Sequence, residues 1–60
     1  MHFVVLHEKG VEILVNTDLI ACLRSVESNA GTLTEIVLSS GRVVAVDEPY
    51  HEVRRAIYGN

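Results

Sequence analysis

Hydrophobic and polar positions alternate along the first part of the chain. Residues 3–7 (FVVLH) and 11–15 (VEILV) are rich in Val and Ile, which favour the pleated, half-buried surface of a sheet. Glu8, Lys9 and Gly10 connect the two runs, and a glycine at the end of so short a loop supplies the left-handed backbone of a tight turn. This pattern predicts an N-terminal β-hairpin.

The segment that follows fits two patterns. Residues 16–18 (NTD) favour a turn or a helix start, because their side chains bond to nearby backbone groups. Beyond them, the apolar residues fit one face of a helix and also one face of a strand. We favour a turn over 16–19 and a strand over about 20–27, because a helix here would lack an ending signal. The helical alternative for 16–23 stays open.

Two further turns, at 28–31 (SNAG) and 39–41 (SSG), separate the remaining apolar runs. Residues 34–38 (TEIVL) and 42–46 (RVVAV) have the composition of strands. About five short strands joined by tight turns predict an antiparallel meander that curls into a barrel-like sheet.

The last part of the chain changes to a helical period. Asp47 and Glu48 precede Pro49; proline is well tolerated in the first turn of a helix, and carboxylates there can cap the free N–H groups. Gly59 is expected to end the helix. The apolar stripe of this helix consists of Tyr50, Val53, Ala56 and Ile57. A helix of about ten residues is unstable alone in water, so we expect the stripe to pack on the sheet or on a neighbouring subunit.

Together these elements predict a single α+β domain over residues 1–60, a small antiparallel curled sheet or barrel-like meander of about five strands with one C-terminal helix. So short a chain removes only about 60% of its unfolded surface from water, and a self-associating surface would add stability. Val43 and Ala45 fall on the second face of their strand, and apolar residues on both faces indicate that the helix or another copy covers that face. We therefore expect a homo-oligomer, with Val43, Ala45 and the helical stripe as its interaction or packing residues.

Charge and hydropathy argue against two kinds of partner. The net charge is −3 and the chain has five Lys and Arg residues, whereas binding by phosphate neutralisation needs a concentrated basic surface. Nucleic acid is therefore an unlikely partner. No apolar run approaches the roughly 20 residues that cross a bilayer, and the N-terminus lacks a signal-peptide pattern. We expect no membrane span and a cytoplasmic location.

Candidate chemistry concentrates where the helix begins. That segment contains four ionisable residues in six positions, Asp47, Glu48, His51 and Glu52. On a helix Glu52 points away from His51, and a metal site would need further ligands from elsewhere. His2 and His7 would face opposite sides of one strand. We therefore expect no metal, no cofactor and no enzymatic activity, with an enzyme that uses His51 as the opposing hypothesis.

Cys22 is the single cysteine, so no internal disulfide can form. It stands among aliphatic residues, and a thiol in such surroundings is expected to be buried and inert. Arg24 would share its face on a strand, which leaves a redox role as the alternative.

Three stretches, VNTDLIACLRSV, IVLSSGRVVAVDE and HEVRRAI, resemble the FlbD/SwrD family of small bacterial flagellar and swarming-motility proteins. The resemblance covers roughly residues 3–58. The matching positions are Val15, Asn16, Asp18, Leu19, Ile20, Ile36, Leu38, Gly41, Val44, Val46, Glu48, Glu52, Val53 and Ile57. It implies a small sheet with a C-terminal helix and a role in motility, and it brings no catalytic residue with it.

The leading hypothesis is a small non-enzymatic protein-interaction module that binds itself and another protein, in bacterial flagellar or swarming motility. The alternative from another class is a small nucleic-acid-binding or transcription-regulatory domain, because some such domains share this order of strands and helix.

Overall fold

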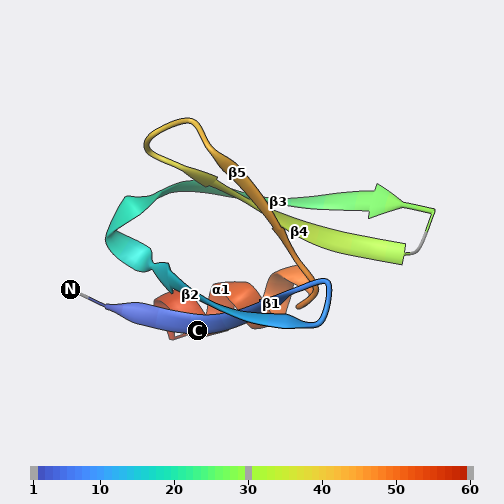
Figure 1. The fold of residues 1–60 in the computed structure, drawn as a ribbon, viewed down its shortest axis with the longest axis horizontal. Coiled ribbons are helices and arrows are strands. Elements are labelled where there is room, and N and C mark those ends of the chain that lie inside the picture. The colour runs from blue at the N-terminus through green and yellow to red at the C-terminus, as the bar shows by residue number, and fades with distance from the viewer. Residues whose placement is uncertain (1, 30, 60) are drawn as a thin grey trace.

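The computed structural model describes residues 2–29 and 31–59 and contains five antiparallel strands in two sheets followed by one helix (Figure 1). The elements are β1 (Phe3–Glu8), β2 (Val11–Asn16), the 3₁₀ turn η1 (Thr17–Leu19), β3 (Ile20–Ser28), β4 (Gly31–Leu38), β5 (Val43–Val46) and α1 (Tyr50–Tyr58). The α+β class with a C-terminal helix is confirmed. The turn expected over 28–31 includes residue 30, which lies outside the described residues.

The N-terminal hairpin of β1 and β2 has a tighter turn than the sequence predicts. Glu8 pairs with Val11, so only Lys9 and Gly10 form the loop. Both have positive φ, 51° and 83°, as the type I′ hairpin turn requires. Gly10 adopts this backbone at little cost, whereas a side chain such as that of Lys9 disfavours it.

The ambiguous segment after the hairpin is a turn followed by a strand, as favoured. The Asn16 side chain accepts a hydrogen bond from the Asp18 backbone N–H at 3.0 Å, and this bond holds η1, a single 3₁₀ turn, in place. The Ile20 backbone is extended and begins β3. The longer helical alternative over 16–23 is wrong, because the aliphatic run from Ile20 pairs with β4.

The second sheet has the order β3-β4-β5. A register shift between Ile20 and Cys22 marks a bulge where β3 enters it. On the central strand, Ile36 lies opposite Leu23 on one side and Val44 on the other. These three side chains share the inner face of the sheet.

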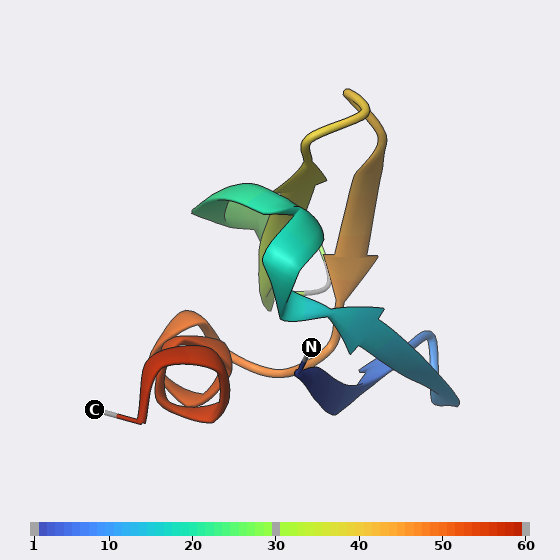
Figure 2. The same cartoon turned by 90° about the vertical axis from the view of Figure 1, so that its left-hand side faces the viewer.

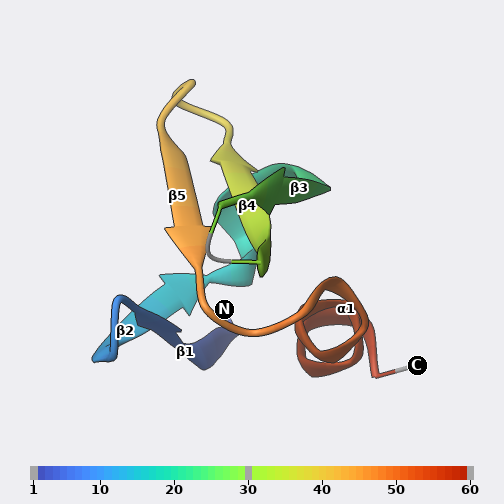
Figure 3. The ribbon, with the colours of Figure 1, turned by 90° about the vertical axis from the view of Figure 1, so that its right-hand side faces the viewer.

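The hairpin and α1 lie on the same side of the three-stranded sheet and enclose the core with it (Figures 2 and 3). The strands form two sheets rather than a closed barrel. α1 and each strand except β3 contribute to the buried core, which consists of Val4, Leu6, Val15, Ile36, Val46 and Val53. So few fully buried hydrophobic residues give a small core, in agreement with the length of the chain.

Candidate functional site: an acidic junction and an uncovered sheet face

Asp47 leaves β5 and binds the turn of the N-terminal hairpin. Its two carboxylate oxygens accept hydrogen bonds from the backbone N–H groups of Lys9 and Gly10, at 3.1 and 2.7 Å. Its own backbone N–H donates to the His7 carbonyl at 2.7 Å. Asp47 therefore holds the hairpin turn in its left-handed conformation and connects the two sheets.

Glu48 completes this junction from the next position. Its carboxylate accepts the His7 backbone N–H at 2.9 Å and lies 2.6 Å from Nδ1 of the His7 ring. The Glu48 carbonyl accepts the Thr34 hydroxyl at 2.8 Å. Thr34 is fully buried, and this bond satisfies its only side-chain polar group. Glu48 thus fixes β1 and β4 against the segment that leads into α1.

The His7–Glu48 contact favours the charged form of both side chains. The hydrogen bond to Glu48 raises the pKa of His7 above 6.5; desolvation opposes this, and the charges of Glu48, Glu12 and Asp47 support it. Partial burial of Glu48 acts to raise its pKa, but the hydrogen bonds from His7 outweigh burial and the pKa lies below 4.5. The junction therefore contains an ion pair when His7 is protonated.

The expectation that Asp47 and Glu48 cap the helix is wrong. Pro49 is the N-cap residue of α1, and no side chain makes a capping hydrogen bond there. Both carboxylates bind the hairpin instead, where they satisfy three backbone N–H groups. Gly59 does end the helix, with a left-handed backbone at φ 74°.

The remaining ionisable residues of the acidic segment stay apart from the junction. His51 and Glu52 are exposed on α1, and neither bonds to Asp47 or Glu48. Within residues 2–29 and 31–59, no three His, Cys, Asp or Glu side chains converge as metal ligands. His7, by contrast, received no role from the sequence pattern, because its partner Glu48 lies 41 positions away.

The predicted helical stripe is only partly buried. Val53 is fully buried and Ile57 packs against the core. Ala56 is exposed, and 36% of the Tyr50 surface is accessible. The helix therefore anchors itself through Val53 and Ile57, and Tyr50 and Ala56 face solvent.

The three-stranded sheet has a second face that no described element covers. We call it the outer face. Side chains alternate along a strand, so the residues between the inward-facing ones point to this face. Its apolar members are Cys22, Val26, Leu33, Val37, Val43 and Ala45. Cys22 and Val43 are exposed, and the other four are half-buried. The hairpin and α1 both lie on the other side (Figures 2 and 3).

Besides its apolar residues, the outer face carries an ion pair and, at its end, Ser28. Arg24 Nη2 lies 2.8 Å from Glu35 Oε1 in a cross-strand pair. The expectation that Cys22 is buried is wrong: its side chain is exposed, because the strand alternation turns it to the outer face. The Arg24 side chain shares that face with Cys22 and is bound to Glu35.

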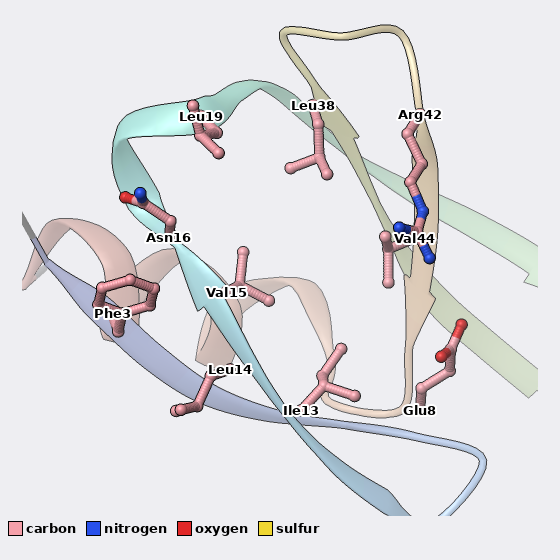
Figure 4. Close-up of a pocket in the computed structure, with 10 residues that line it drawn as sticks. All are labelled: Phe3, Glu8, Ile13, Leu14, Val15, Asn16, Leu19, Leu38, Arg42 and Val44. Carbon is pink, nitrogen blue, oxygen red and sulfur yellow. The ribbon is translucent and has the colours of Figure 1, made fainter.

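A groove of about 370 Å³ opens where the two sheets separate (Figure 4). Ile13 and Val15 of β2 line one side, and Leu38 and Val44 of the second sheet line the other. Arg42 supplies a cationic group at the β5 end. The incomplete closure of the strands therefore leaves a largely apolar depression beside β5.

Within the described residues, α1 is the one α-helix and has nine residues. No helix of residues 2–29 and 31–59 is long and apolar enough to span a membrane. Comparison with protein-family models, with characterised proteins and with solved structures gives no match to this chain.

Proposed function

We propose that this protein is a non-enzymatic interaction module that binds protein, including further copies of itself, through the outer face and its border at β5. The observation that carries the proposal is the uncovered outer face, with six apolar side chains on one side of a three-stranded sheet. A sheet of this kind normally has one face packed and the other polar. Here the second face is apolar as well, which is typical of a contact surface.

The chemistry of the junction supports a structural role for its charged groups. Asp47 and Glu48 accept bonds from the hairpin backbone and from His7. Groups held in this way stabilise the fold, so we assign the function to the outer face and not to the junction. The resemblance to the FlbD/SwrD family supports flagellar or swarming motility as the process in which the contact is used.

The first test is the oligomeric state. Val43 is 46% exposed on the outer face at the β5 border, so Val43→Glu places a charge in any contact made there. We expect the wild type to form oligomers at micromolar concentration in sedimentation or light scattering, and Val43→Glu to weaken association at least tenfold.

Val11→Glu is the matched control, because Val11 is 64% exposed on the hairpin, away from the outer face. It should associate like the wild type. A wild type that stays a folded monomer up to millimolar concentration would contradict the proposal. In a motile bacterial host, loss of swarming on deletion and rescue by wild type but not by Val43→Glu would connect the contact to the process.

A further inference from the structure

The free edge of β5 presents backbone groups that have no partner within the described chain. The Leu38 N–H donates to the Arg42 carbonyl at 2.8 Å, so Arg42, and with it Val44 and Val46, direct their backbone groups toward β4. Alternation along the strand then directs the N–H and C=O groups of Val43 and Ala45 away from β4. The Asp47 N–H confirms this direction, because it bonds to the His7 carbonyl on the hairpin.

At Val43 and Ala45, the β5 edge has few of the features that keep sheet edges from pairing. Strand β3, at the opposite edge, carries the bulge between Ile20 and Cys22 and contacts α1. Edges are usually blocked by such bulges, by covering elements, by charges or by proline. Residues 43–46 (VVAV) have neither a charge nor a proline, and β5 forms a strand ladder only with β4. The hairpin strand β1 contacts β5 and bonds to Asp47 just beyond its end, so the open part of the edge is the segment of Val43 and Ala45.

We propose that two copies of this chain join edge to edge through β5 and form a continuous six-stranded antiparallel sheet. This inference rests on the proposed function and specifies its partner and geometry. A two-fold axis at Val44 places Val43 of each copy opposite Ala45 of the other. Both residues then exchange N–H···O bonds, which gives four between the copies. The Asp47 N–H is already bonded to His7, so this register uses the backbone groups that are free.

Side chains and charges fit the same arrangement. Val43 and Ala45 of both copies would extend the apolar outer face across the new contact. Arg42 precedes the strand and Asp47 follows it, so the four residues between them pair without bringing like charges together. On the inner side, Val44 lines the groove (Figure 4), and the added strand covers its border.

Amide hydrogen exchange across the association range tests the pairing directly. The Val44 and Val46 amides face β4 and should be protected at every concentration. The Val43 and Ala45 amides should be protected in the associated protein and exchange at least tenfold faster after dilution to the monomer. Unprotected Val43 and Ala45 amides in the associated protein would overturn the pairing.

Two variants separate this inference from the proposed function. Ala45→Pro removes an N–H that β4 does not use, so the folded monomer should persist while association falls at least tenfold. Val37→Glu alters the outer face on the central strand and should leave edge pairing intact.

If Ala45→Pro still associates and Val37→Glu does not, the copies pack face to face. That result overturns the β5 pairing and retains the interaction module. A wild type that is monomeric overturns both. If Ala45→Pro fails to fold, the exchange pattern of the wild type decides.

Discussion

At the scale of residues, tertiary contacts override a local rule at Asp47 and Glu48. Acids before a proline and a helix suit capping, yet both carboxylates bind the hairpin. The hairpin turn explains the preference: Lys9 has positive φ, and its N–H and that of Gly10 need acceptors that the turn itself does not supply. Two carboxylate oxygens from one side chain satisfy both.

We expect stability to depend on pH through His7 and Glu48. The raised pKa of His7 means that its contribution is complete below 6.5 and is lost as pH rises through the higher folded value. The lowered pKa of Glu48 means that its contribution is complete above 4.5 and is lost as pH falls through the lower folded value. Stability from this pair is therefore greatest between 4.5 and 6.5.

Urea unfolding at about pH 5.5 and about pH 8.5 measures the alkaline limb of this dependence. The wild type should be less stable at the higher pH, and His7→Gln should show a smaller difference. An equal difference in both proteins would contradict the ion pair. His51→Gln is the control, because His51 is exposed on α1, and it should follow the wild type.

Replacement of Asp47 should destabilise the fold. Asp47→Ala leaves the Lys9 and Gly10 N–H groups to bond with water and releases the turn, for an expected loss of about 1–2 kcal/mol in the free energy of unfolding. Glu52→Ala on the exposed face of α1 should stay within about 0.5 kcal/mol of wild type. Chemical denaturation measures both, and equal effects of the two substitutions would refute the role given to Asp47.

At the scale of elements, the sequence predicts what short-range patterns determine. The hairpin follows from β-branched runs around Gly10, and the helix from Pro49, the Val53 and Ile57 spacing and Gly59. The exposure of Cys22 depends on which sheet face is covered, and no local pattern carries that information. The junction was missed for the same reason: His7 and Glu48 are brought together only when the hairpin and the second sheet dock.

The hairpin turn offers a way to increase stability. Lys9 occupies the first position of a type I′ turn at φ 51°, where Asn is preferred because it tolerates the left-handed backbone. Lys9→Asn should raise the free energy of unfolding by about 0.5 kcal/mol. This gain is a part of the ~1–2 kcal/mol that the left-handed conformation costs residues other than Gly, Asn and Asp. Lys9→Ala keeps the unfavourable backbone and should give no such gain. A thermal melt of the three proteins distinguishes them, and equal gains would argue for an effect of the lost charge.

At the scale of the whole molecule, two sheets and a helix enclose a small core and leave the outer face and the Val43 to Ala45 part of the β5 edge uncovered. Fold class and element order were predictable, because each element carries its own hydrophobic period. The separation of the strands into two sheets was not, because it depends on how η1 and the acidic junction orient the hairpin against β5. The same arrangement directs the apolar outer face and the β5 edge to one border, which is why the proposed contacts are adjacent.

The junction also determines when the chain can complete its fold during synthesis. Glu48, the partner of His7, lies 41 residues further along the chain. Asp47, which binds the hairpin turn, immediately precedes Glu48. Residues up to Glu48 must therefore leave the ribosome before the first two strands can dock on the second sheet. Until then, the nascent chain exposes aliphatic segments to chaperones and to neighbouring chains.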